Sequence, residues 1–186
     1  MAEIAIEDLP AATRARFADN DAAQAALDAV LVAARRYCGW HVSPVRVGDV
    51  LTLDGPGVSV LELPTRKLNA VTAVTENGSA VDVSRLNWSE RGMVRKKSAW
   101  SCDYSSIAVT ITHGFTEDEA ADWRKAIIDM VNTVSYSMAT SSDSLKRKKV
   151  DNVEYEWFDF ASASGDAVYA VSSVLDAYRL PAVLGV

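Results

Sequence analysis

Residues that could carry out catalysis or bind a metal are few in this sequence and lie far apart. There are two histidines, His41 and His113, and two cysteines, Cys38 and Cys102. Histidine can act as a general base and cysteine as a nucleophile, but either role needs a partner group beside it. Neither histidine stands in a recognisable nucleophile–base motif, and Cys38 falls on the apolar face of a predicted helix. We therefore predict packing or capping roles for these three residues, and reduced thiols in a cytoplasmic setting.

The densest acidic cluster is Glu117, Asp118 and Glu119. Carboxylates in such a cluster can bind a divalent cation. However, Thr116 stands three residues before Glu119, which is the spacing of a capping box, and acids favour the first turn of a helix. We interpret the cluster as a helix start. The sequence also contains no CxxC, GxGxxG, GxxxxGK[ST], HExxH or GxSxG motif. We predict a protein that is not an enzyme, with no catalytic residue, no metal site and no cofactor.

Two basic clusters, at 95–97 and 146–149, could contact nucleic acid. The formal net charge of the chain is −6 and its pI is about 4.9, which is a poor basis for coating a phosphate backbone. A solvated loop, a DNA contact and an acidic partner surface are the alternatives for the second cluster. That cluster and the aromatic residues after it are Lys146, Arg147, Lys148, Lys149, Tyr155, Trp157 and Phe158.

Three segments have the apolar spacing of an amphipathic helix, i, i+3, i+4, i+7. The first runs from about 21 to 38 and ends at Gly39, with the apolar positions Ala23, Ala26, Leu27, Val30, Leu31, Ala34 and Cys38. The second runs from 116 to about 138, with Ala120, Trp123, Ile127, Met130, Val131, Val134 and Met138. The third runs from about 166 to 178, with Val168, Val171, Val174, Leu175 and Tyr178.

Between 45 and 113 the pattern changes to short β-branched runs separated by turns. Asn77-Gly78 is a strong hairpin signal, because both residues tolerate positive φ. A second hairpin is expected around 90–92. These elements predict an α+β fold with a mainly helical core, made of N-terminal, central and C-terminal helices, and an inserted small antiparallel β unit of hairpins.

Length and composition indicate a globular protein. The chain has 186 residues, of which 49% are hydrophobic and 24% charged, enough for one domain with a real core. No run of 18 apolar residues exists, and the acidic start does not resemble a secretion signal. We expect a single domain over 1–186, divided into an N-terminal extension (1–20), a helix (21–39), a β unit (45–114), a helix (116–139), a flexible arm (140–165), a helix (166–179) and a docking tail (180–186).

The last residues are unusually apolar for a chain end. They include Tyr178, Leu180, Pro181, Val183, Leu184 and Val186. Terminal residues are usually polar and frayed unless they dock on something. The tail therefore either folds back on its own core or inserts into a partner, and composition alone favours neither.

The order of these motifs resembles the head–tail connector (adaptor, or head-completion) family of long-tailed phages. The resemblance covers about residues 21–186 and rests on packing and turn patterns. These are ARRYCGW at 34–40, SP at 43–44, LELP at 61–64, LNAVTAVTENG at 68–78, Trp100, VTITHGF at 109–115 followed by an acid-capped helix, and LDAYRLP at 175–181.

The resemblance implies a structural virion protein at the head–tail interface, present in the host cytoplasm during assembly and not in a membrane. Such proteins form a twelve-fold ring beneath the portal, extend the DNA channel and carry a stopper or tail-completion protein. Genomic DNA would pass through without tight binding. The resemblance suggests a portal interface at Tyr178, Arg179, Leu180, Pro181, Val183 and Leu184. It also makes the basic and aromatic residues of the arm, named above, candidates for contact with a neighbouring subunit or the stopper. The alternative is a nucleic-acid-binding module that uses the basic arm.

Overall fold

The computed structural model describes residues 4–140, 145–150, 153–158, 167–168 and 171–181. The chain divides into two compact units. The strand unit consists of Gly39–Ala120 and the segment that begins at Leu180. The helix unit consists of the residues up to Cys38 and of Ala121–Arg179. The described helices include none that is both long and apolar enough to span a bilayer.

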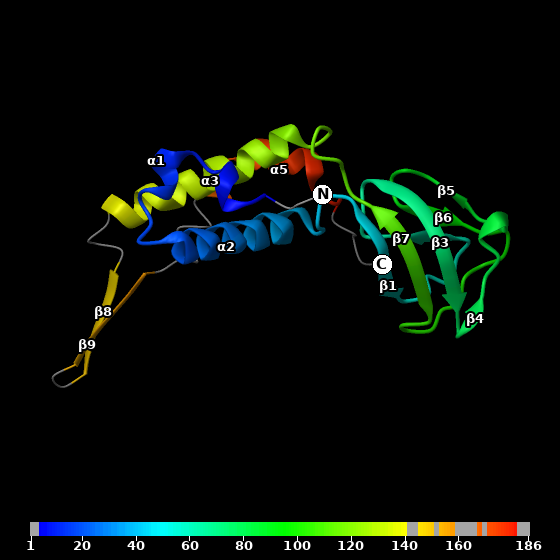
Figure 1. Cartoon of the computed structure of the whole chain (residues 1–186). Coiled ribbons are helices and arrows are strands. Elements are labelled where there is room, and N and C mark those ends of the chain that lie inside the picture. The colour runs from blue at the N-terminus through cyan, green and yellow to red at the C-terminus, as the bar shows by residue number, and fades with distance from the viewer. Residues whose placement is uncertain (1–3, 141–144, 151–152, 159–166, 169–170, 182–186) are drawn as a thin grey trace. The chain divides into compact units, whose positions relative to one another are not determined.

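The strand unit contains two antiparallel sheets (Figure 1). The first has the order β1-β7-β3-β4, with β1 at Arg46–Leu53, β7 at Ile107–His113, β3 at Leu68–Glu76 and β4 at Ser79–Ala80. The second has the order β2-β6-β5, with β2 at Val60–Glu62, β6 at Met93–Arg95 and β5 at Asn87–Trp88. A short 3-10 helix, η2, spans Val83–Arg85.

Strand β7 is central to the first sheet, because β1 and β3 both pair with it. Its residues alternate between buried and half-buried, and Ile107, Val109 and Ile111 are fully buried. These side chains join a core that the strand unit builds from its own residues. The other buried members are Leu61, Leu63, Leu68, Val71, Val74, Leu86, Val94 and Trp100.

The prediction of a mainly helical core with a small inserted β unit is wrong, although the broader α+β class holds. The two sheets of the strand unit enclose their own hydrophobic core. The description as hairpins also falls short, since β1 and β7 pair across more than fifty residues. Local periodicity detects the two-residue turns, but it carries no information on strands that pair over such a separation.

The predicted local turns are present. Asn77 and Gly78 have φ of 49° and 76° and connect β3 to β4. Strands β5 and β6 form the second hairpin. Both turns need only neighbouring residues, which is why the sequence pattern reveals them.

The helix unit is built on α2 (Asn20–Cys38), which contacts α3 (Ala121–Thr140) and α5 (Ser172–Tyr178). The seven positions predicted to form the apolar face of the first helix are the buried residues of α2. In α3 the side chains of Trp123, Ile127 and Met130 are buried. The capping box forms as predicted, with the Thr116 N–H donating to Glu119 over 2.9 Å, but the regular helix begins only at Ala121.

Two segments outside the main helices, the N-terminal extension and the arm, contain more regular structure than predicted. The first twenty residues contain η1 (Ile6–Asp8) and α1 (Ala11–Arg14), and they bury Ile4, Leu9 and Phe17. In the segment expected to be a flexible arm, β8 (Leu145–Val150) and β9 (Val153–Phe158) pair as an antiparallel hairpin.

Candidate functional site

Cys38 has the geometry of a packing residue. Its side chain is fully buried, and its thiol donates a hydrogen bond to the Leu175 carbonyl at 3.5 Å. Burial raises the pKa of the thiol to about 12. A thiol with such a pKa stays protonated at neutral pH, so it is a poor nucleophile and a poor metal ligand. Cys102 is an exposed free cysteine.

The two histidines, 72 positions apart in the sequence, lie together in the strand unit. The rings of His41 and His113 stack with centroids 4.6 Å apart and planes 4° from parallel. Trp40 lies beside both, with its ring centroid 5.8 Å from that of His41 and 6.4 Å from that of His113. Nε2 of His113 lies 3.1 Å from a carboxylate oxygen of Asp49, and this hydrogen bond is the main cause that lowers the pKa of Asp49.

Gly114 makes the histidine stack possible. Its φ is +107°, and a Cβ built there would lie 2.4 Å from Cε1 of His41 and 2.8 Å from the Pro44 carbonyl oxygen. Both histidines are more than nine-tenths buried. The arrangement is therefore a packed aromatic cluster at the end of β7. The sequence shows no signal for it, because the contact joins residues on separate elements.

The acidic cluster forms the predicted capping box, but it lies in the turn at 117–120 that precedes α3 and not in the helix itself. Glu119 accepts hydrogen bonds from the Thr116 N–H and hydroxyl, and Lys67 Nζ lies 3.0 Å from its carboxylate. The Thr116 N–H and Lys67 lower the pKa of Glu119 to about 2. Within the described part of the chain, no three His, Cys, Asp or Glu side chains are placed to hold a metal ion.

The basic cluster at 95–97 is split between the surface and the interior. Lys96 pairs with Glu76 and lies over the ring of Trp100, 4.3 Å from its centroid. Arg95 and Lys97 are exposed. One of the three cations is therefore already committed to the strand unit's own structure.

The cluster at 146–149 lies in β8. The register places Lys146 opposite Trp157, Arg147 opposite Glu156, Lys148 opposite Tyr155 and Lys149 opposite Glu154. Phe158 stands opposite Leu145. Residues directly opposite one another are the closest cross-strand neighbours, and opposite charges there stabilise a hairpin. The backbone thus brings two of the four basic residues to positions that face acids.

The residues predicted to face a portal have different environments. Tyr178 is buried in the helix unit, where its hydroxyl donates to Asp122 and its ring meets that of Trp123 edge-on at 5.8 Å. Arg179 is exposed and lies over the Tyr37 ring, 5.0 Å from its centroid. Val183 and Leu184 lie outside the described residues.

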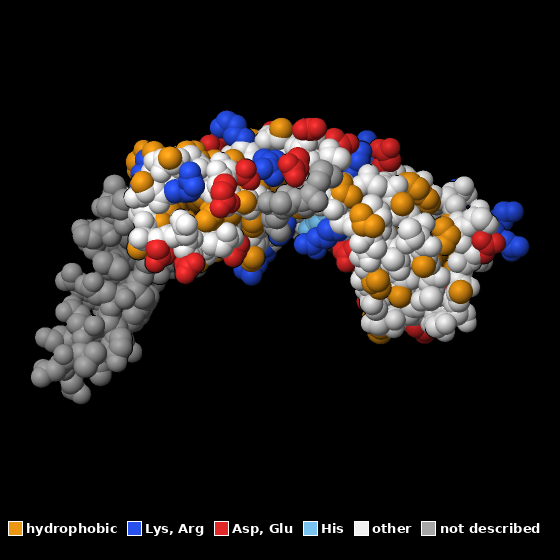
Figure 2. Space-filling model, in the orientation of Figure 1, with side chains coloured by type: hydrophobic (Ala, Val, Ile, Leu, Met, Phe, Trp, Pro, Cys, Tyr) orange, Lys and Arg blue, Asp and Glu red, His pale blue; other side chains and the backbone are white. Residues whose placement is uncertain are grey.

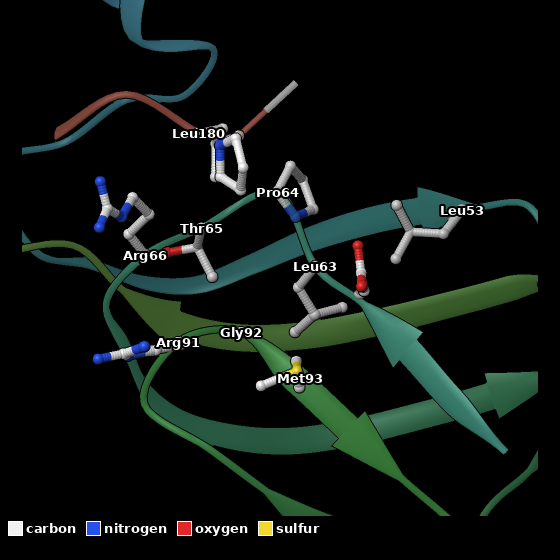
Figure 3. Close-up of a pocket in the computed structure, with 11 residues that line it drawn as sticks. Leu53, Leu63, Pro64, Thr65, Arg66, Arg91, Gly92, Met93 and Leu180 are labelled. Carbon is white, nitrogen blue, oxygen red and sulfur yellow. The ribbon is translucent and has the colours of Figure 1, made fainter. Parts of the chain in front are cut away.

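Leu180 and Pro181 line a cavity of about 450 Å³ in the strand unit (Figure 3). Its other apolar residues are Leu53, Leu63, Pro64 and Met93, and Thr65, Gly92, Glu62, Arg66 and Arg91 complete the lining. Figure 3 shows the guanidinium groups of Arg66 and Arg91 on one side and Leu53 on the opposite side. The lining therefore combines apolar side chains with charged groups, and the size of the cavity is typical of a site that binds a small molecule or a short peptide.

The strand unit also carries most of the exposed large hydrophobic residues among those described. Figure 2 shows hydrophobic side chains spread over the visible face of the strand unit, with charged side chains more frequent on the helix unit. The exposed residues of the strand unit are Val47, Val50, Val58, Trp88, Met93 and Tyr104, against Val32 and Tyr136 in the helix unit. Together with the cavity, they make the strand unit the better candidate for binding a partner.

Comparison with known proteins identifies the fold. No family model matches the sequence, and no curated protein matches it. Among solved structures, the chain is similar to one from the neck of an empty GTA particle, in a structure computed with C6 symmetry. The TM-score is 0.57 and the identity 14%, and the similarity covers 100% of this chain and 96% of that one. The chain therefore shares, over its whole length, the fold of a neck protein.

Proposed function

We propose that this protein is a structural subunit of the neck of a phage-like particle, a head-to-tail adaptor that is not an enzyme. In this role it forms a ring beneath the portal, extends the DNA channel and joins the capsid to a stopper or tail-completion protein. The observation that carries the proposal is the fold shared over the full chain with a chain from the neck of a GTA particle, a phage-like gene transfer agent.

The residues that follow α5 are the proposed contact with the portal. Tyr178 is fixed by Asp122 and Trp123, so it holds the end of the helix while the next residues leave the helix unit. Arg179, Leu180 and Pro181, followed in the sequence by Val183 and Leu184, then supply the contact. Buried anchor residues next to an apolar segment are what a docking peptide requires, since the anchor reduces the entropy lost on binding.

The β8–β9 hairpin is the proposed contact with a neighbouring subunit or the stopper. A two-stranded hairpin is marginally stable in water on its own. Among the described residues, each strand pairs only with the other, so each leaves one edge open. Strand addition at such an edge is a common mode of association. A closed ring also needs a heterologous interface, in which one patch meets a different patch on the next subunit.

The acidic net charge of −6 supports a channel through which DNA moves without tight binding. In the alternative, a nucleic-acid-binding module, the 146–149 cluster would hold the phosphates. Replacing its four basic residues with alanine separates the two functions. If the protein is an adaptor, the alanine variant should still assemble with the portal. If the original protein binds DNA strongly and in a salt-dependent way, and the variant does not, the nucleic-acid-binding module is favoured.

Light scattering tests the main proposal. The mass is measured for the protein alone, for its mixture with purified portal protein of the same particle, and for a form that ends at Tyr178. A portal complex that is lost in the shortened form supports the adaptor and its docking segment. A Lys125→Ala variant, changed at an exposed residue of α3 outside this segment, should keep the complex. A folded protein that forms no complex under any of these conditions contradicts the proposal.

A further inference from the structure

The cavity of the strand unit is open, apolar and already in contact with the chain's own final segment. Leu63 is buried in its wall, while Met93 is 44% exposed. A volume of about 450 Å³ is far larger than a single water needs, so the cavity has room for several side chains. Six of the eleven lining residues are leucine, proline or methionine, and water against these side chains finds few hydrogen-bond partners, so an occupant with apolar side chains is favoured there.

Leu180 and Pro181 set the direction of the chain at this cavity. Leu180 packs on Gly39, where a built Cβ would lie 3.5 Å from Cδ1 of Leu180. A residue before proline is driven toward extended backbone, and proline itself has a fixed φ. The chain therefore arrives at the cavity extended, with two of its residues forming part of the lining.

The next five residues in the sequence are Ala-Val-Leu-Gly-Val, at 182–186. None is charged, and three have branched aliphatic side chains. An extended chain advances at most about 3.6 Å per residue, so two residues beyond Pro181 can reach no farther than roughly 7 Å and three no farther than roughly 11 Å. No apolar peptide has easier access to the cavity, because a segment linked this closely is present at a high effective concentration.

We propose that residues 182–186 occupy this cavity of the same chain before assembly, and that the portal displaces them. The second part of the proposal, displacement by the portal, rests on the proposed function. The same apolar segment then has two alternative positions, one in its own strand unit and one on the portal. When residues 182–186 occupy the cavity, their apolar side chains are covered in the free subunit. Because the portal competes with the cavity for this segment, the segment leaves the cavity only when the portal is present.

Disulfide trapping tests the first half without any portal. Cys102 is replaced by serine, and Cys38 stays because it is buried. Cysteines are then introduced as Met93→Cys with Leu184→Cys. The matched control is Tyr104→Cys with Leu184→Cys, because Tyr104 belongs to the same unit, is 89% exposed and is not part of the cavity lining. Under mild oxidation at low protein concentration, the intramolecular disulfide of the first pair should form at least tenfold faster.

The products distinguish the occupants. Equal rates in the two pairs overturn the proposal. A disulfide that links two chains, with a rate that rises with protein concentration, overturns it in favour of a second copy's segment. Methyl NMR of the full-length Val183→Asp/Leu184→Asp variant gives an independent measurement. The Met93 methyl signal should shift, while that of Met130, buried in the helix unit, should not. An unchanged Met93 signal also overturns the proposal.

Adding portal protein tests displacement. The Met93–Leu184 disulfide should form at least tenfold more slowly once the portal is bound. If the portal binds and the rate is unchanged, the displacement half is wrong while the adaptor function stands. If no portal complex forms but trapping succeeds, the proposed function fails and the occupied cavity stands.

Discussion

The two units contain different kinds of titratable group with shifted pKa values. In the helix unit, burial raises the pKa of the Cys38 thiol to about 12, burial and Asp122 raise the pKa of Tyr178, and Asp176 raises that of Tyr37. In the strand unit the pKa values of carboxylates are lowered, with Lys67 the one base whose pKa is raised among the described groups. The shifted groups of the helix unit are therefore a thiol and phenols that stay neutral at pH 7, whereas most of those in the strand unit are carboxylates held by hydrogen bonds and nearby cations.

Two tryptophans, one in each unit, give the largest expected effect. Trp123 is 1% exposed in the helix unit, whereas Trp88 is 40% exposed in the strand unit. Trp123→Ala should lower the free energy of unfolding by about 3–5 kcal/mol, because it removes a large buried side chain and leaves a cavity. Trp88→Ala should change it by about 0.5 kcal/mol or less. Urea denaturation measures both, and similar losses would refute the contrast.

Alkaline pH should destabilise the helix unit. The pKa of Cys38 is about 12 in the folded protein against 9.0 for the unperturbed thiol. Because the folded value is the higher one, the contribution is complete below pH 9 and is lost as pH rises toward 12. The expected loss approaches about 4 kcal/mol, at 1.4 kcal/mol for each unit of pKa.

Urea denaturation followed by helical circular dichroism measures this loss between pH 8 and 12. The Cys38→Ala variant is the control, since it lacks the thiol. Because the variant has a different stability at pH 8, the quantity compared is the slope of the free energy of unfolding against pH. A slope as steep as that of the original protein would show that the thiol is not the cause.

Gly114→Ala tests the histidine stack of the strand unit. The new methyl group would meet His41 at 2.4 Å, at a backbone φ of +107°. We expect a loss of about 2–4 kcal/mol in the free energy of unfolding. Gly78→Ala is the matched control, because its φ is +76° but nothing lies within 4 Å of the built Cβ, and it should cost about 1 kcal/mol. Thermal unfolding of Gly114→Ala with His41→Ala should recover part of the loss, and no recovery would place the strain elsewhere.

The smallest expected effect is the contribution of Glu119 to stability at acidic pH. The pKa of Glu119 is lowered from 4.5 to about 2 by the Thr116 N–H and Lys67. Because the folded value is the lower one, the stability it provides is present above pH 4.5 and is lost as pH falls toward 2. Glu119→Gln should flatten the fall of the melting temperature in this range. A fall as steep as that of the original protein would show that the Glu119 carboxylate is not its cause.

The sequence predicted the features that depend on neighbouring residues. The buried face of α2 follows from the spacing of Ala23, Leu27 and Leu31, and the turn between β3 and β4 follows from Asn77-Gly78. It did not predict the features formed by distant residues. Strand β1 joins the first sheet through pairs such as Arg46 with His113. Leu53, Met93 and Leu180 come from separate parts of the sequence and all line the cavity. Alternating patterns show which face of a strand is buried, but not which strand lies beside it.

The chain enters and leaves the strand unit between the two main helices of the helix unit, and this order matters during synthesis. Helix α2 is complete at Cys38, and its principal partner α3 begins only at Ala121. The 82 residues from 39 to 120 must therefore leave the ribosome first. At roughly 5–20 residues per second, that takes about 4–16 s. During this interval the apolar face of α2 lacks α3, whereas every strand of the first two sheets lies between residues 46 and 113, so these sheets can form before α3 is synthesised.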